Sequence, residues 1–142
     1  MTASPALDLT TARRTLADQP FSRLLGARLT AFGDGVATLE IDIREELRQQ
    51  NGFLHGGVLS YAADNALTFA AGAVLGPHVL TGGFSLQYLR PATGRTLRAR
   101  AEVVHAGRRQ AVVRCDLLTL DEDGTGTLCA VAQGTVLPVQ AP

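Results

Sequence analysis

A single carboxylate, Asp64, stands in a long stretch of apolar residues. Apart from one tyrosine hydroxyl, the other clearly polar side chains of this stretch are Ser60, Asn65 and Thr68. In a helix, Ser60, Asp64 and Thr68 lie on one stripe because they are spaced by four residues. A carboxylate that loses its hydration among apolar side chains is a candidate functional residue. The structural alternative is an acid that an arginine or backbone groups satisfy at a subunit interface.

The apolar stretch is preceded by a motif with two glycines, His55-Gly56-Gly57. Glycines at a helix start let a ligand oxygen approach backbone N–H groups that have no partner within the helix. The helix dipole favours negative charge at the same place. Gly56 or Gly57 is therefore a candidate donor to a developing oxyanion. The alternative is a glycine-rich turn that leads into the helix, with His55 as its cap.

Together these residues resemble the hotdog-fold thioesterases, most closely the branch with the phenylacetate-degradation and 4-hydroxybenzoyl-CoA enzymes. That branch shows an amide residue, a glycine, the motif His-Gly-Gly and an acid nine residues after the histidine. The corresponding positions here are Gln49, Gly52, His55-Gly56-Gly57 and Asp64. A hydroxyl residue one turn beyond the acid and a strand that ends in Tyr-x-x-Pro also match, at Thr68 and at Tyr88 to Pro91. The resemblance covers roughly residues 20 to 138.

The resemblance implies a role for each catalytic position. Asp64 acts as general base on water or as nucleophile. The Gly56 N–H polarises the thioester carbonyl, helped by the Gln49 amide. Thr68 holds the water or the acid, and His55 fixes the loop.

The resemblance is looser for the residues that bind substrate. Many relatives carry Asn where this chain has Gln49, so the amide could come from another register, such as Asn51. In relatives, basic residues near one hairpin meet the phosphates of coenzyme A; the alternative here is a solvated hairpin tip. The candidates for contacts with substrate are Gly57, Asn51, Thr81, Arg90, Arg108 and Arg109.

Hydrophobic patterning predicts one long helix among strands. Residues 57–75 are alanine-rich and apolar nearly all round, which predicts a helix surrounded by protein. Short helices are expected at residues 10–18, capped by Thr10 or Thr11, and at residues 21–25. The predicted strands are residues 27–32, 38–43, 84–88, 97–103, 113–117 and 128–137.

The order of two strands, one helix and four strands predicts an α+β domain. We expect a hotdog fold, in which an antiparallel sheet wraps around one long central helix. Residues 1–19 are expected to form an N-terminal extension with a short helix, and residues 20–142 a single hotdog domain.

Composition excludes several other classes of protein. Thirteen basic residues, all arginine, balance thirteen acidic ones, so no net field favours nucleic acid or a membrane surface. Cys115 and Cys129 form no CxxC pair, so we predict no metal site and no cofactor. The N-terminus lacks the apolar run of a signal peptide, and glycines and a proline interrupt the longest uncharged stretch. We therefore expect a cytoplasmic protein with reduced thiols and no membrane span.

Two other functions remain open at this stage. Hotdog-fold hydratases and dehydratases need an acid and a histidine together, whereas the long helix carries an acid but no histidine. A non-catalytic acyl-CoA-binding protein is the second alternative. A regulator with a helix-turn-helix is disfavoured because only about 26 residues precede the first strand.

Helix geometry also predicts the assembly. Gly56 and Asp64 are eight residues apart, which separates them by about 12 Å along one helix. Reacting atoms must come within roughly 3 to 3.5 Å of one another. We therefore expect a homodimer with shared active sites, in which Gly56 of one copy faces Asp64 of the other. The resemblance further implies a homotetramer, as a dimer of dimers, acting on acyl-CoA.

Overall fold

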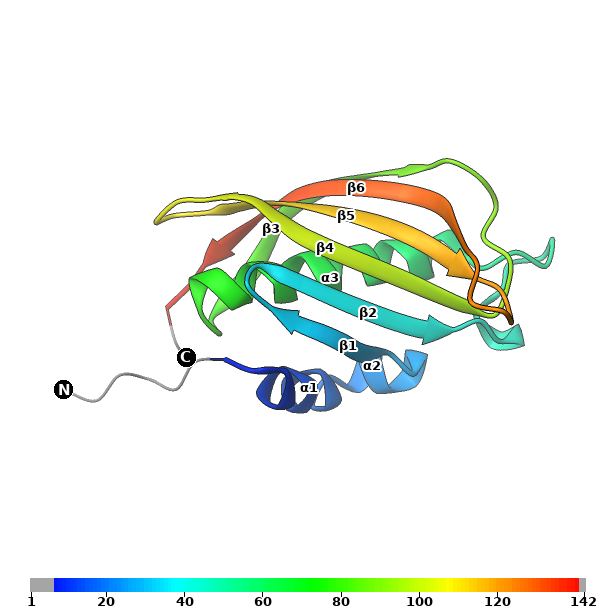
Figure 1. Ribbon diagram of the computed structural model, residues 1–142, viewed down its shortest axis with the longest axis horizontal. Helices are drawn as coiled ribbons and strands as arrows, with labels where there is room; N and C mark the ends of the chain where they lie inside the picture. Colours follow the sequence, from blue (N-terminus) through cyan, green and yellow to red (C-terminus); the bar gives the residue numbers. More distant parts are fainter. Residues whose placement is uncertain (1–6, 141–142) are drawn as a thin grey trace.

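The computed structural model describes residues 7–140 and consists of a six-stranded sheet wrapped around one long helix, α3 (Gly56–Leu75) (Figure 1). Residues 1–6 of the predicted extension and the last two residues of the predicted domain lie outside this range. The α+β hotdog architecture is confirmed. By length and composition α3 resembles a membrane span, but ten of its residues are buried, so it is the core helix.

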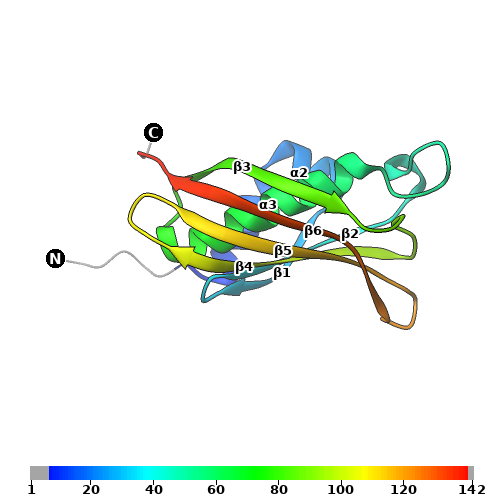
Figure 2. The ribbon, with the colours of Figure 1, turned by 90° about the horizontal axis from the view of Figure 1, so that it is seen from above.

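All neighbouring strands are antiparallel, in the order β1-β2-β4-β5-β6-β3. Because α3 connects β2 to β3, the chain passes beneath β4, β5 and β6 on the concave face of the sheet (Figure 2). Strand β3 is thus an edge strand beside β6. The strands are β1 (Arg28–Gly33), β2 (Val36–Asp42), β3 (Val79–Tyr88), β4 (Thr96–Ala106), β5 (Ala111–Leu120) and β6 (Gly126–Pro138), with a 3₁₀ turn η1 (Glu45–Leu47) after β2.

Strand β3 starts earlier than predicted, at Val79 rather than at Phe84. Its pairing with β6 shifts register between Thr81 and Gly83, which marks a β-bulge. A bulge inserts an extra residue and interrupts the alternation of side chains. The first half of β3 therefore does not show the period of two that identifies a strand in the sequence.

Two short helices precede the sheet, α1 (Leu9–Ala17) and α2 (Pro20–Leu25). The predicted cap of the first helix at Thr10 or Thr11 is wrong. The cap is Asp8, whose carboxylate accepts the Thr11 N–H at 2.8 Å. Helix α1 packs on β1, and its Ala12 and Leu16 belong to the same buried cluster as α3 and the sheet.

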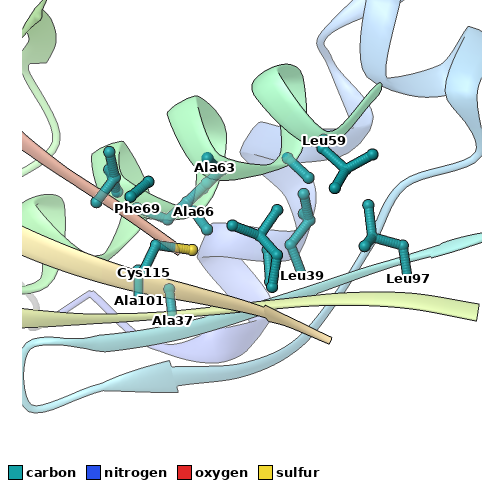
Figure 3. Packing of buried hydrophobic residues seen from close by; sticks show 14 of the residues in the cluster. Ala37, Leu39, Leu59, Ala63, Ala66, Phe69, Leu97, Ala101 and Cys115 are labelled. Atoms are coloured by element: carbon teal, nitrogen blue, oxygen red, sulfur yellow. The ribbon is translucent and has the colours of Figure 1, made fainter. Parts of the chain in front are cut away.

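The core is built from small side chains where α3 meets the sheet (Figure 3). Ala63 and Ala66 of the helix face small residues of the strands, including Ala37 and Ala101, and all four are at most 1% exposed. Because these side chains are short, the helix backbone lies close to the sheet. Such close packing tolerates little change in side-chain volume. Larger side chains of the same cluster lie on either side of these alanines: Leu39, Leu59 and Leu97 toward one end of the helix contact and Phe69 toward the other.

We expect Gly134→Ala to lower the free energy of unfolding by about 1 to 3 kcal/mol, because the new methyl group overpacks the β3–β6 contact. A Cβ at Gly134 would lie 2.5 Å from the Cβ of Phe84 and 2.6 Å from the Gly83 carbonyl oxygen. Urea denaturation measures the change. The matched control is Gly107→Ala, whose Cβ would meet only one atom, at 3.9 Å. An equal loss in both variants would contradict the steric explanation.

Candidate active site

Asp64 is half-buried on the stripe of α3 that faces away from the sheet. Its Oδ1 accepts the Thr81 hydroxyl at 2.5 Å, from the first half of β3. The Thr68 hydroxyl donates to the Asp64 carbonyl oxygen at 2.8 Å and lies 2.7 Å from Thr81 Oγ1. The structure thus brings together three residues predicted from sequence. Among residues 7–140 no arginine pairs with Asp64, so one chain does not supply the arginine partner of the structural alternative.

Gln49 organises the loop that precedes α3. Its side-chain Oε1 accepts the backbone N–H groups of Asn51 at 2.5 Å and Phe53 at 3.4 Å. Its backbone N–H donates to the Phe53 carbonyl, and its carbonyl accepts the Gly52 N–H. Because the oxygen of the amide faces the loop, the Nε2 group faces away from it. Asn51 is exposed and meets Gln49 only through its backbone.

In the first turn of α3, the hydrogen bonds of the described residues use the Gly57 N–H but not the Gly56 N–H. His55 is the N-cap, and its Nδ1 accepts the Gly57 N–H at 2.8 Å. The Val58 N–H donates to the His55 carbonyl. Within the described range, the Gly56 N–H has no acceptor. The His55 side chain therefore accepts the Gly57 N–H, which leaves the Gly56 N–H as a donor at the positive end of the helix dipole.

Gly56 also makes a contact that a side chain would disturb. The Tyr88 hydroxyl, at the end of β3, donates to the Gly56 carbonyl at 2.8 Å. A Cβ at Gly56 would lie 2.9 Å from the Tyr88 hydroxyl oxygen. The sequence marks Tyr88 only as part of the Tyr-x-x-Pro motif, and this contact with the helix start needed the structure.

A groove of about 370 Å³ joins the loop, the start of α3 and the segment after β3. It brings the predicted residues Gln49, Gly56 and Arg90 together, and Tyr88 lies on its wall. Asp64 lies about two turns further along α3 than Gly56 and does not line this groove. One chain therefore carries two separate groups of candidate site residues, called the two half-sites below: a carboxylate with two hydroxyls, and a groove with an amide and the Gly56 N–H.

The remaining predicted arginines lie elsewhere. Arg108 and Arg109 are exposed at the hairpin between β4 and β5, where they line a groove of about 620 Å³ with His105. This hairpin is at the opposite end of the sheet from the loop before α3 (Figure 1). Within one chain, these arginines do not meet the Gln49–Gly56 groove.

Sequence reasoning missed a polar network beside Asp64. The Ser22 hydroxyl donates to Gln19 Oε1 at 2.6 Å, and it lies 2.5 Å from the Tyr61 hydroxyl. Asn65 Nδ2 donates to Tyr61 at 2.9 Å and to Gln19 at 3.1 Å. Burial raises the pKa of Tyr61, and the nearby Asp64 carboxylate adds to the rise. The network holds α2 against α3; helical spacing alone indicates only that Tyr61 and Asn65 share a face.

The buried cysteines do not join the site. Burial raises the pKa of the Cys115 thiol to about 12 and raises that of Cys129 as well, so neither supplies a thiolate nucleophile near neutral pH. Among residues 7–140 there is no group of three His, Cys, Asp or Glu side chains placed to hold a metal ion.

Comparison with known proteins connects this geometry to one family. The model of the thioesterase superfamily matches residues 51–125, a range that includes α3. A thioesterase family protein from Silicibacter pomeroyi superposes with a TM-score of 0.85 at 32% identity, over 91% of this chain and 96% of its own.

The names of two further relatives mention a degradation process or a substrate. A mutant of the phenylacetic acid degradation protein PaaI from Thermus thermophilus superposes with a TM-score of 0.75 at 29% identity, over 85% of this chain and 100% of its own. The 1,4-dihydroxy-2-naphthoyl-CoA hydrolase of Listeria monocytogenes is 26% identical, over 62% of this chain and 73% of its own.

Proposed function

Because this chain belongs to the thioesterase superfamily, we propose that it hydrolyses an acyl-CoA thioester to the free acid and coenzyme A. The observation that carries the proposal is the Asp64 carboxylate on the polar stripe of α3, which accepts the Thr81 hydroxyl, while the Thr68 hydroxyl donates to the backbone carbonyl of Asp64. A relative that is named a CoA hydrolase supports coenzyme A as the thiol.

In this reaction Asp64 acts as general base. It takes one proton from water, and the water oxygen bonds to the carbonyl carbon. The C–S bond then breaks, its electron pair leaves on the sulfur of coenzyme A, and the sulfur takes up a proton. In the alternative, the carboxylate attacks the carbonyl itself, the C–S bond breaks with its electron pair leaving on the coenzyme A sulfur, and water hydrolyses the resulting anhydride to the acid and the free carboxylate.

The hydroxyls beside Asp64 suit a general base. Thr81 donates to Asp64 Oδ1, and Thr68 has two acceptors within reach, the Asp64 carbonyl oxygen and Thr81 Oγ1. The 2.7 Å contact between the two hydroxyls can therefore form with Thr68 as the donor while Asp64 is ionised. A proton on Oδ1 would complete a chain from Asp64 to Thr81, from Thr81 to Thr68 and from Thr68 to the Asp64 carbonyl. The cluster can thus hold the proton that water loses.

The oxyanion site in this proposal is the groove at the start of α3. The Gly56 N–H donates to the carbonyl oxygen as negative charge develops there, and the helix dipole stabilises that charge. The Gln49 amide nitrogen faces away from its loop and can add a second donor. The same proposal assigns three arginines to the phosphates of coenzyme A. They are Arg90 at this groove, and Arg108 and Arg109 at the exposed hairpin.

The two half-sites meet in a homodimer. Gly57 is exposed and Ser60 and Asp64 are half-buried, so one stripe of α3 is left partly uncovered. The outer edge of β3 is also unpaired within the described chain. Two antiparallel copies of α3 about a two-fold axis would cover the stripe and place Gly56 of one copy beside Asp64 of the other. A dimer of such dimers is the tetramer that we propose.

We expect Asp64→Asn to lower kcat by about 10²- to 10⁴-fold and to leave the fold intact, because the amide cannot take the proton from water. Release of free thiol from a panel of acyl-CoAs measures the activity, and circular dichroism checks the fold. The matched control is Asp116→Asn on the exposed outer face of the sheet, which should keep wild-type activity. A near-normal kcat in Asp64→Asn would refute this mechanism. Hydration of an enoyl-CoA would instead indicate a hydratase, and tight binding without turnover an acyl-CoA-binding protein.

Thr81→Val should lower kcat about 10- to 100-fold with little change in KM, because it removes a hydrogen bond to a charged carboxylate. Thr81→Ser restores the hydroxyl and should recover most of the activity. If the serine variant were as slow as the valine variant, Thr81 would act through packing and the proton chain would be wrong.

Shared sites predict recovery of activity when two inactive variants are mixed. Asp64→Asn damages the carboxylate half, and Gln49→Ala damages the groove half, including the loop that Gln49 holds. A mixed dimer has one doubly damaged site and one intact site, and half of randomly exchanged dimers are mixed. Activity should therefore return to about a quarter of wild type. If mass spectrometry shows exchange while activity stays at the residual level, each chain builds its own site.

A further inference from the structure

A cavity of about 140 Å³ lies between α1 and the outward stripe of α3. Its wall on α3 includes Thr68, Phe69 and Gly72, and its wall on α1 includes Ala12 and Thr15. The lining is mainly apolar, with Phe69 packed edge-on against Phe32. It is a separate space from the groove that holds Gln49 and Gly56.

Thr68 connects this cavity to the reacting carboxylate. Its side chain lines the cavity, and its hydroxyl lies 2.7 Å from the Thr81 hydroxyl that donates to Asp64. A thioester carbonyl beside Asp64 would therefore have its acyl carbons at the Thr68 end of the cavity. This step rests on the proposed function.

We infer that the α1–α3 cavity takes the acyl group, so that the N-terminal helix α1 contributes to substrate specificity. An apolar cavity of roughly 150 Å³ is known to hold one benzene ring. The substrate class is thus a compact acyl group, either a single ring or a chain of about six carbons. Thr15, an exposed residue of α1, and Gly72 of α3 limit the size, because both are small residues that line the cavity from different helices.

Gly72 leaves room that a side chain would fill. Gly72 lies within the apolar helix α3, yet a Cβ there would meet only Val79, at 3.8 Å. Glycine is unfavourable in a helix interior, so its presence here is not explained by helix formation. What the glycine provides is open space on the side of α3 that lines the cavity.

The experiment measures binding as well as turnover. Calorimetry with the thioethers S-hexyl-CoA and S-methyl-CoA gives the contribution of the longer chain to affinity without hydrolysis. Thr15→Leu should lower the affinity for S-hexyl-CoA about tenfold or more relative to S-methyl-CoA, because the new side chain excludes about two methylene groups from the cavity. The matched control is Thr10→Leu on the same helix, which does not line the cavity and should leave the ratio unchanged.

Gly72→Leu is the second variant, from the opposite wall, and melting temperatures identify any variant that does not fold. Hexanoyl-CoA and phenylacetyl-CoA should lose kcat/KM relative to acetyl-CoA in both cavity variants. Unchanged ratios in a folded Thr15→Leu or Gly72→Leu protein, with normal turnover of acetyl-CoA, would overturn the cavity assignment and leave the proposed function standing. If the wild-type protein released no thiol from any acyl-CoA, the proposed function would fail, and the thioether affinities alone would decide the cavity assignment.

Discussion

The contact between α3 and the concave face of the sheet is the interaction on which the rest of the molecule depends. Alanines on both surfaces bring the helix backbone close to β2 and β4, and the buried side of the helix is entirely apolar. A helix that buries one side in this way must place its polar residues on the other. Asp64 therefore faces out of the core while the surrounding protein still keeps it half-buried.

The edge strand β3 completes the arrangement around Asp64. Its bulge lets Thr81 and Phe84 both face the helix although they are three residues apart. Thr81 then reaches the Asp64 carboxylate, while Tyr88 at the far end of the strand reaches the Gly56 carbonyl. One strand thus contacts both half-sites, and the helix between them sets their separation.

The N-terminal helices cover only part of the outward stripe of α3. Helix α2 is held by the network of Ser22, Tyr61 and Asn65, and α1 encloses the cavity next to Thr68. The part of the stripe around Gly57 and Ser60 is left for another surface. The same helix therefore contributes the core, the carboxylate, the proposed oxyanion donor and the surface proposed for a second copy.

The sequence by itself determined the type of fold, the long helix and the set of residues with chemistry, because these depend on local patterns. The apolar stretch, the His-Gly-Gly motif and the isolated Asp64 are visible without coordinates. Tertiary structure alone decided which residues meet. A bulge hid the start of β3, so the pairing of Thr81 with Asp64 had only a loose signal. Gln19 and Ser22 carry no recognisable pattern, yet they contact α3 across about 40 residues of chain. Such long-range contacts depend on how separate elements pack, and spacing along the chain does not encode them.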